Sequence, residues 1–226
     1  MKSEIKKPVI LSILDGWGIR SETLGNAVAL ANTPNMDYLK SNYPNAKLVT
    51  HGKAVGLPKF QVGNSEVGHM NLGAGRKILM DLPRIDEAIF AGFFEQDPNF
   101  KSFVETVKQF QGDVHLIGLC SNGGVHCHQN HILSAIKALH QNGLRVFLHM
   151  VLDGRDVPPK SALANLEEFR KISEDLDFIA TISGRFYSMD RDKRWERTTL
   201  FFNSIVSRQG KVFESAQDFI QEEYQS

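Results

Sequence analysis

The chain has 226 residues, of which 42% are apolar, and its 26 Lys and Arg residues are balanced by 26 Asp and Glu residues. This length suits one large domain or two modest ones with a substantial core. The balanced charge excludes a global basic field that would hold a nucleic acid or an anionic membrane surface, so any anion site must be local. The two cysteines are too few for a disulfide framework.

The N-terminal segment lacks the pattern of a secretory signal. Lysines lead into a short apolar stretch that meets a charge at Asp15, whereas a signal needs a longer apolar core and a small-residue cleavage site. No stretch approaches the roughly 20 apolar residues of a membrane-spanning helix. We therefore expect a cytoplasmic protein without a nucleic-acid or membrane partner.

The first part of the chain contains two predicted elements and a long irregular region. Residues 8–14, PVILSIL, form a continuous aliphatic run that is typical of a strand buried on both faces of a parallel sheet. Residues 33–44 begin with a threonine cap and an early proline and end at a second proline, which predicts a helix. The region that follows is rich in Gly, Asn and His, and long loops in compact domains are usually functional.

From about residue 83, helices and strands alternate regularly. The predicted helices cover residues 83–94, 98–110, 131–143, 160–175 and 194–206, and the predicted strands cover residues 113–119, 144–152 and 177–183. This alternation indicates βαβ crossovers and a mostly parallel sheet of the α/β class. A change in composition near residues 76–83 suggests two architectural units, residues 1–79 and 80–226.

Polar clusters follow the predicted strands. They are Asp15, residues 120–131 (CSNGGVHCHQNH), residues 153–159 (DGRDVPP) and residues 184–197 (GRFYSMDRDKRWER). In doubly wound α/β folds, the chemistry collects in loops beyond the carboxyl ends of the strands. Each cluster places charge or imidazole at such a position.

Several of these residues also have purely structural interpretations. An Asp after a buried strand is a turn former or helix cap about as often as a metal ligand. Ser65, in GNSEVG, is either a helix cap or a nucleophile. The second cluster contains a His-rich run made up of His126, Cys127, His128 and His131. One such cluster is a weak zinc signal, and a solvated loop is the better interpretation for His128 and His131.

The arginines of the last two clusters point to an anion. Arg155, Arg185 and Arg191 each follow a predicted strand and lie beside a glycine or an acidic residue. Guanidinium groups bind phosphate and carboxylate oxygens in pairs, so several at one sheet edge suggest a small, doubly anionic substrate. Arg194 and Arg197 instead fit the exposed face of a salt-bridged helix N-terminus.

Six motifs occur in order along nearly the whole chain: LDGWG, GNAVALANTPNMDYL, GNSEVGHMNLGAGR, GGVHCH, LDGRDVPP and GRFYSMDRDKRWER. With them the sequence resembles the cofactor-independent phosphoglycerate mutases, glycolytic isomerases that interconvert 3-phosphoglycerate and 2-phosphoglycerate through a phosphoserine intermediate. The resemblance implies that residues 1–79 begin an alkaline-phosphatase-like, metal-binding domain. Residues 80–226 would then form part of an inserted α/β phosphotransferase domain that binds the substrate.

The resemblance also implies roles for individual residues. Ser65 would be the phosphorylated nucleophile, and Asp15 and Ser65 would be ligands of one of two divalent ions, expected to be Mn²⁺, that activate the hydroxyl. Such a pair would have its oxygens within about 3–5 Å. Five residues would converge on one pocket to hold the phosphoglycerate: His126, Arg155, Asp156, Arg185 and Arg191.

The sequence departs from the family pattern in length and in one loop. Family members are about twice as long, and the segment that completes the metal sites follows the point where this sequence ends. Asn122 stands where relatives usually have Asp, and Cys127 where they often have Ser. We therefore expect the isolated chain to be inactive, because Asp15 and Ser65 alone supply too few ligands for two ions.

Two alternatives to an active mutase stay open at this point. The first is another metal-dependent phosphomutase of the alkaline phosphatase superfamily with a different phosphorylated substrate. The second is a phosphoglycerate-binding fragment that pairs with a separately encoded C-terminal half.

Overall fold

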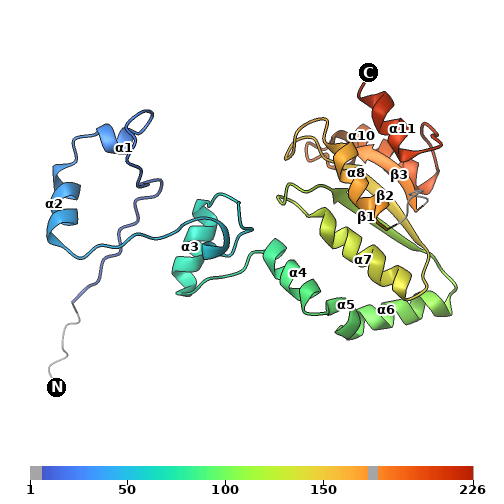
Figure 1. The fold of residues 1–226 in the computed structure, drawn as a ribbon, viewed down its shortest axis with the longest axis horizontal. Coiled ribbons are helices and arrows are strands. Elements are labelled where there is room, and N and C mark those ends of the chain that lie inside the picture. The colour runs from blue at the N-terminus through green and yellow to red at the C-terminus, as the bar shows by residue number, and fades with distance from the viewer. Residues whose placement is uncertain (1–6, 173–177, 226) are drawn as a thin grey trace. The chain divides into compact units, whose positions relative to one another are not determined.

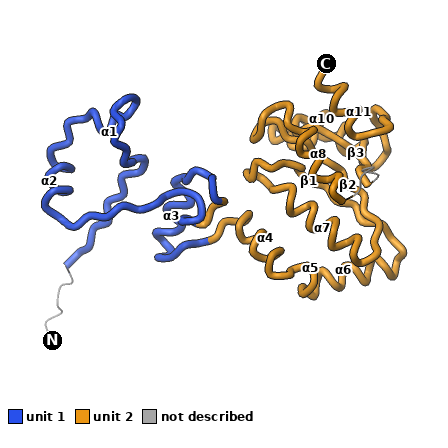
Figure 2. The backbone as a smooth tube through the Cα atoms, in the orientation of Figure 1, with its two compact units in different colours: residues 1–55, 59–78 blue, residues 56–58, 79–226 orange. Residues whose placement is uncertain are grey.

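The computed structural model describes residues 7–172 and 178–225. The chain divides into two compact units, which Figure 2 shows in different colours. Unit 1 comprises residues 1–55 and 59–78, and unit 2 comprises residues 56–58 and 79–226. Across the described ranges, no helix combines the length and apolar character that crossing a membrane requires.

Unit 1 is built from short helical elements joined by extended segments. These elements are α1 (Ala27–Leu30), α2 (Pro34–Asn42), the 3₁₀ helix η1 (Gly52–Val55) and α3 (Ser65–Ala74). α2 confirms the helix predicted over residues 33–44, with its proline in the first turn as expected. The side chain of Thr33 makes no capping hydrogen bond, and its hydroxyl instead donates to the Asp37 carboxylate at 3.4 Å.

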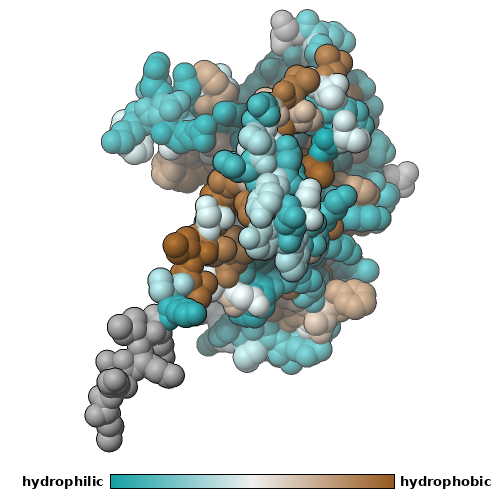
Figure 3. Space-filling view, turned by 90° about the vertical axis from the view of Figure 1, so that its left-hand side faces the viewer, coloured by the Kyte–Doolittle hydropathy of each residue, from teal (hydrophilic) through white to brown (hydrophobic). Residues whose placement is uncertain are grey.

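The strand predicted over residues 8–14 is wrong for this structure. The segment is not part of a strand, and its aliphatic side chains are exposed, with Val9 at 96% and Ile10 at 87%. Figure 3 shows that hydrophobic residues, drawn in brown, are exposed on the face of the molecule that it displays. A strand forms only where its backbone groups pair with a neighbouring strand. Within the described part of the chain, the only sheet consists of three strands of unit 2.

The sheet of unit 2 has three parallel strands in the order β1-β2-β3 (Figure 1). They are β1 (Val114–Cys120), β2 (Val146–Leu152) and β3 (Ile179–Gly184). These strands confirm the three predicted after residue 83, although residue 177, the first of the last prediction, lies outside the described residues. In the register, Cys120 lies opposite Leu152, and Leu152 lies opposite Gly184. All three carboxyl ends therefore meet at one edge of the sheet.

Helices surround this sheet in unit 2. They are α4 (Asp81–Phe90), α5 (Phe93–Gln96), α6 (Pro98–Gln109), α7 (Gln129–Gln141), α8 (Ala162–Arg170), α9 (Arg185–Ser188), α10 (Trp195–Val206) and α11 (Ala216–Glu223). The predicted helices are present, except that the first is divided into α4 and α5 at Gly92, where φ is 85°. Residues 173–175, the end of the fourth prediction, lie outside the described residues. α9 and α11 had not been predicted.

The two crossover helices cover the same face of the sheet. α7 connects β1 to β2, and α8 connects β2 to β3. Because consecutive strands are neighbours and parallel crossovers are right-handed, both helices must lie on one side, as Figure 1 shows. Ile136 of α7 and Phe169 of α8 pack with Leu148 of β2 in the core, which Val104 of α6 and Ile220 of α11 complete.

A row of polar side chains crosses the three strands on the other face of the sheet. Nδ1 of His115 in β1 lies 2.9 Å from Nε2 of His149 in β2. Nδ1 of His149 lies 2.9 Å from the hydroxyl oxygen of Thr181 in β3. These contacts pair polar groups of buried His149 that would otherwise lose their hydration.

Candidate active site

Unit 1 brings Asp15 and Ser65 together, although fifty positions separate them in the sequence. The Ser65 hydroxyl donates a hydrogen bond to Oδ2 of Asp15 at 2.6 Å. The expected proximity is therefore present. The two oxygens are closer than the roughly 3–5 Å expected for a metal-bridged pair, because they are joined directly by a hydrogen bond.

Ser65 is the first residue of α3 and does not cap it. Asn64 is the cap, since its side-chain oxygen accepts the N–H of Val67 at 2.9 Å. The interpretation of Ser65 as the helix cap is therefore wrong, because the residue before it has that role. The Ser65 hydroxyl is left to contact Asp15, and it stands at a helix N-terminus, where backbone N–H groups without helical partners favour an anion.

His69 lies one turn further along α3 and also contacts Ser65. Its Nδ1 is 2.8 Å from the Ser65 carbonyl oxygen and 3.1 Å from the Ser65 hydroxyl oxygen. A carbonyl oxygen only accepts hydrogen bonds, so the shorter contact favours the tautomer with the proton on Nδ1. In that tautomer Nδ1 cannot take the Ser65 proton, and the hydroxyl donates to Asp15 instead.

Gly63 fixes the path of the chain into α3. A Cβ atom at this position would lie 1.8 Å from the carbonyl oxygen of Thr50. That oxygen belongs to the backbone, and the two segments are also joined by a hydrogen bond from the Gly52 N–H to the Gln61 carbonyl at 2.9 Å. Only glycine permits this approach, which sets where Ser65 begins the helix.

The groups around Ser65 match part of a divalent-metal site. The Asp15 carboxylate and the Ser65 hydroxyl are hard oxygen ligands of the kind that Mn²⁺ and Mg²⁺ prefer. Among the residues that the structure describes, no group of three or more His, Cys, Asp or Glu side chains is arranged to hold an ion. Asp15 and Ser65 would therefore supply only part of a coordination shell of about four to six ligands.

Unit 2 contains a cavity of about 330 Å³ beyond the carboxyl edge of its sheet. Its lining residues follow β1, β2 and β3: His126, Arg155, Arg185, Phe186, Met189, Asp190, Arg191, Asp192 and Arg197. Four of the five residues predicted to hold the substrate line it, and the fifth, Asp156, contacts Arg185 and His126. The expected convergence is therefore present, as parallel strands with aligned ends require.

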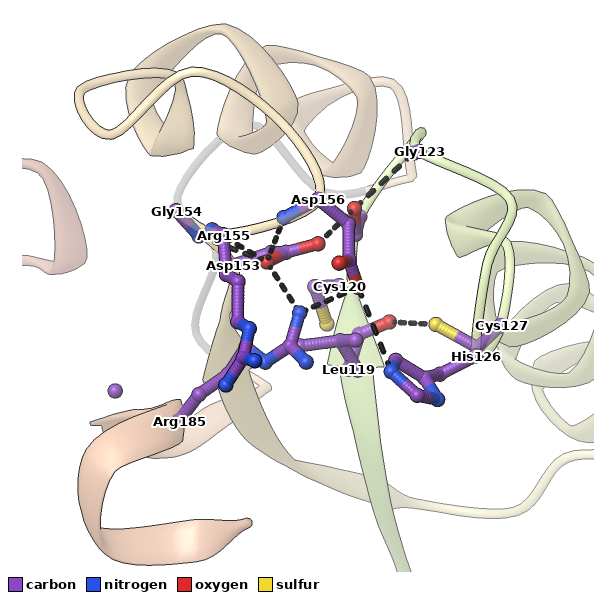
Figure 4. Close-up of polar contacts among 12 residues, drawn as sticks. Leu119, Cys120, Gly123, His126, Cys127, Asp153, Gly154, Arg155, Asp156 and Arg185 are labelled. Carbon is purple, nitrogen blue, oxygen red and sulfur yellow. Dashed lines mark hydrogen bonds and ion pairs between the residues drawn. The ribbon is translucent and has the colours of Figure 1, made fainter.

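Asp153, the first residue after β2, organises this edge (Figure 4). Its side chain is 1% exposed, and its Oδ1 accepts the backbone N–H groups of the next three residues at 2.8, 3.0 and 3.2 Å. Its Oδ2 accepts the Ser121 hydroxyl at 2.7 Å. Burial would raise the pKa of this carboxyl, but the Arg155 N–H, the Arg185 guanidinium and the Ser121 hydroxyl together hold it well below its ordinary value.

Arg185 links the two carboxylates of the loop after β2. Its Nη1 donates to Oδ1 of Asp153 at 2.8 Å and to Oδ2 of Asp156 at 2.5 Å. Burial would lower the pKa of the guanidinium, and the two hydrogen bonds raise it above its ordinary value. Nε2 of His126 lies 3.6 Å from the same Asp156 oxygen. Asp156 therefore connects the loops after β1, β2 and β3 through His126 and Arg185, and two carboxylates already balance the charge of Arg185.

Arg155 and Arg191 differ from Arg185 in having no such partner. Both side chains line the cavity and both residues are exposed. Among the residues that the structure describes, neither guanidinium has a hydrogen bond or an ion pair. The cavity therefore presents two uncompensated guanidinium groups, which is the charge pattern expected for binding a polyanion.

The prediction for the α10 arginines is half right. Arg194 is exposed and pairs with Glu196 at 2.7 Å, as expected. Arg197 was predicted to lie on the exposed face, but its side chain is only 24% exposed and lines the cavity. Which face of α10 turns inward depends on how the helix packs, and the sequence around these arginines does not reveal it.

The remaining lining residues were not assigned a role from the sequence. They are Phe186, Met189, Asp190 and Asp192. Their only sequence signal is their position in the motif that follows β3. Asp153 was not among the predicted site residues either. Its position directly after a predicted buried strand is the sequence feature that could have identified it.

The His-rich loop after β1 contributes to no group of three or more metal-ligating side chains among the residues that the structure describes. Nδ1 of His128 accepts the Asn130 N–H at 3.2 Å and so caps α7. Nε2 of His131 lies 2.7 Å from an Asp86 carboxylate oxygen, and its side chain is 16% exposed. Both histidines therefore have structural partners. The solvated loop expected for them is wrong for His131, which lies within α7, whereas His128 is a partly exposed loop residue that precedes this helix. Burial raises the pKa of the Cys127 thiol in the same loop, which disfavours the thiolate that zinc requires.

The fold and the site define an α/β protein with a parallel sheet and a cationic cavity at the carboxyl ends of its strands. Residues 85–226 match the family model described as the N-terminus of BPG-independent phosphoglycerate mutase. The chain belongs to the family of BPG-independent phosphoglycerate mutases, and it matches the N-terminal part of that family. This confirms the resemblance carried by the six motifs.

Curated relatives and a solved structure agree with this assignment. The chain is 47% identical over 222 residues to 2,3-bisphosphoglycerate-independent phosphoglycerate mutase of Listeria innocua, covering 97% of this chain and 44% of the relative. It is 47% identical over 218 residues to the enzyme of that name from Roseobacter denitrificans, covering 96% of this chain and 43% of the relative. The chain thus spans less than half the length of these relatives.

The solved structure supports the fold. A crystal structure of Leishmania mexicana phosphoglycerate mutase, determined at low cobalt concentration, superposes with a TM-score of 0.66 and 34% sequence identity. The match covers 87% of this chain and 38% of that one. The α/β architecture with a parallel sheet is therefore that of the N-terminal part of a phosphoglycerate mutase.

Proposed function

We propose that this chain is the substrate-binding and nucleophile-bearing part of a glycolytic phosphoglycerate mutase that interconverts 3-phosphoglycerate and 2-phosphoglycerate. The observation that carries the proposal is the cavity of unit 2, where Arg155 and Arg191 have no partner among the described residues and lie beside His126 and the fixed Arg185. A glycolytic role would place the protein in the cytoplasm.

The chemistry of the cavity suits a phosphoglycerate. Its volume of about 330 Å³ is at the lower end of the roughly 300–1,000 Å³ typical of small-molecule sites. The substrate carries a carboxylate and a phosphate, and two unpaired guanidinium groups can bind oxygens of both in bidentate fashion. Asp156 contacts two of the lining residues, Arg185 and His126, and in this proposal its carboxylate accepts a hydrogen bond from a hydroxyl of the glycerate.

In the proposed reaction Ser65 is the nucleophile. Its oxygen attacks the phosphorus of 3-phosphoglycerate and loses its proton, the bond from phosphorus to O3 breaks, and O3 takes up a proton, so that phosphoserine and glycerate result. The O2 hydroxyl of the glycerate then attacks the phosphoserine and loses its proton, the bond from phosphorus to the Ser65 oxygen breaks, and the Ser65 oxygen takes up a proton. Asp15, which accepts the Ser65 hydrogen bond, orients the hydroxyl, and the N-terminus of α3 favours the phosphate dianion.

We propose two divalent ions, Mn²⁺ by preference, as the cofactors. Asp15 and Ser65 would be ligands of one of them, because both offer hard oxygens at one point. Such ions lower the pKa of a coordinated hydroxyl and balance the charge of a transferring phosphoryl group. Since these two residues supply only part of a coordination shell, turnover would depend on further polypeptide of the kind that the longer relatives possess.

Binding of ligands to the 226-residue chain tests the proposal. Isothermal titration calorimetry should detect 3-phosphoglycerate and 2-phosphoglycerate, with weaker binding of glycerate and of inorganic phosphate. Arg155→Met and Arg191→Met should each weaken binding about tenfold or more, because each removes a charge-assisted contact. Arg84→Met is the matched control, since Arg84 pairs with Asp81 on the surface of α4.

Two results would contradict the proposal. Absence of phosphoglycerate binding would remove the substrate-binding role of the cavity. Equal or tighter binding of a sugar phosphate, such as ribose 5-phosphate, would favour a different phosphomutase of the superfamily.

A further inference from the structure

The loop that carries Arg191 connects α9 to α10 and is held by its own side chains. Arg191 itself is exposed and unpaired within the described residues. Lys193, two positions later, has φ of 59°, a conformation that a residue with a side chain adopts only where its surroundings hold it. The position of the Arg191 guanidinium therefore depends on what fixes this loop.

The side chain of Asp190 connects the start of this loop to its end. Its side chain is 3% exposed, and its Oδ2 accepts the backbone N–H of Arg194 at 2.8 Å, which joins the two ends of the segment around Arg191. Its Oδ1 is buried and has no hydrogen bond among the described residues. Nη1 of Arg197 lies 3.6 Å from that oxygen and forms an ion pair with it. A buried carboxylate of this kind needs a cation close by to offset its lost hydration.

Arg197 is fixed in turn by an aromatic ring. Its guanidinium carbon lies 3.8 Å from the centroid of the Phe186 ring of α9. A guanidinium over a ring face gains cation–π attraction and loses little freedom on forming further contacts. Arg197, Asp190 and Phe186 thus connect α10, the loop and α9 in one continuous set of contacts.

We propose that Asp190 and Arg197 are positioning residues that act through Arg191, so that they set the affinity of the cavity for the phosphoglycerate anion without being its main contacts. This inference rests on the proposed function, because it assigns Arg191 to substrate binding. Under this inference, the ion pair of Asp190 and Arg197 in the lining of the cavity has a positioning role.

A double-mutant cycle tests the coupling. 3-Phosphoglycerate binding to the 226-residue chain is measured by calorimetry for wild type, Arg197→Met, Arg191→Met and the double variant. Arg197→Met should weaken binding about fivefold in the wild-type background and by less than about twofold when Arg191 is already Met, since coupled residues are not additive. Equal losses in both backgrounds would overturn the inference, because Arg197 would then act independently of Arg191.

A conservative variant of Arg197 distinguishes a positioning role from a general contribution to folding. Arg197→Lys keeps a cation near Asp190 and should restore most of the affinity that Arg197→Met loses. Arg84→Met serves again as the control for removal of a surface ion pair. Failure of Arg197→Lys to recover any affinity, with an unchanged melting temperature, would contradict a role through Asp190.

A readout without ligand keeps this inference separate from the proposed function. The amide hydrogen of Arg194 donates to Asp190, so its exchange rate reports whether the loop is closed. Arg197→Met should accelerate this exchange about tenfold while leaving the amides of β2 unchanged. Unchanged exchange at Arg194 would overturn the positioning role. Failure of the wild-type chain to bind phosphoglycerate would instead refute the proposed function.

Discussion

At the scale of single residues, the Asp153 carboxylate holds the candidate site in shape. It is buried, and it accepts hydrogen bonds from three backbone N–H groups, one hydroxyl and one guanidinium. These contacts fix the loop after β2, orient Arg185 and connect to Ser121 in the loop after β1. Removing one partner of such a buried ionic network leaves other charges without compensation.

Asp153→Asn should lower the free energy of unfolding by about 3 kcal/mol at pH 7, measured by urea denaturation. The folded-state pKa of Asp153 lies below its ordinary value, so its contribution is present above the pKa of about 3.9 in the unfolded chain. That contribution is lost as the pH falls through the folded-state pKa. The difference between wild type and variant should therefore shrink on acidification from about pH 5 to pH 2.

Asp113→Asn is the matched control for this experiment. Asp113 also pairs with an arginine, Arg145, which lowers the pKa of Asp113, but that pair lies at the surface, where ion pairs stabilise little. Asp113→Asn should therefore lower the free energy of unfolding much less than Asp153→Asn does. A difference between wild type and Asp153→Asn that stayed constant from pH 7 to pH 2 would contradict the assigned ionisation.

At the scale of elements, the two faces of the three-stranded sheet differ in their side chains. One face is aliphatic and packs against α7 and α8, and the other carries the row of His115, His149 and Thr181. His115 also stacks on the ring of Phe147, with the centroids 5.2 Å apart, and Arg145 lies over that ring. The row joins all three strands through side chains in addition to their backbone hydrogen bonds.

The buried histidine of this row should make the stability of unit 2 sensitive to acid. Burial, and then the neighbouring His115, lower the pKa of His149 below its ordinary value. Its contribution to stability is therefore present above the pKa of about 6.5 in the unfolded chain and is lost as the pH falls through the folded-state pKa. Urea denaturation should show a decline in unfolding free energy from pH 7.5 to 5, which His149→Gln should reduce.

His140→Gln, at an exposed position of α7, is the control for removing a histidine. It should leave the decline between pH 7.5 and 5 nearly unchanged. If His149→Gln and His140→Gln gave the same pH profile, burial of His149 would not be the cause of the acid sensitivity.

At the scale of the whole molecule, the two units differ in how many apolar side chains they bury. The hydrophobic core cluster belongs entirely to unit 2. Among the described residues of unit 1, only Gly52 and Val67 are buried. Since burial of apolar surface is the main favourable term in folding, nearly all of the stabilisation of this chain resides in unit 2.

Amide hydrogen exchange of the 226-residue chain should reveal this difference. Amides of β1, β2 and α7 should exchange only through global unfolding, whereas those of α2 and α3 should exchange through local opening at much smaller free energies. Mass spectrometry of peptides from both units measures the contrast in one sample. Equal protection of α2 and β2 would contradict the small core of unit 1.

The sequence by itself determined most of unit 2 and the outline of its cavity. Helical and strand periodicities are local properties, so the alternation after residue 83 predicted the parallel sheet. Because parallel strands end at one edge, the same pattern predicted that His126, Arg155 and Arg185 would meet. The motif around Ser65 likewise singled out the residue that contacts Asp15.

Only the tertiary structure decided which groups are paired and which are free. The aliphatic run of residues 8–14 predicted a strand, but a strand requires a partner that no local pattern supplies. Arg197 was expected to face solvent, yet the packing of α10 turns it toward Asp190 and Phe186. The charge of Arg185 is balanced by contacts with a distant segment, whereas Arg155 has no such partner within the described ranges. Electrostatic attraction depends on distance and burial in space, and neither is encoded in the spacing of residues along the chain.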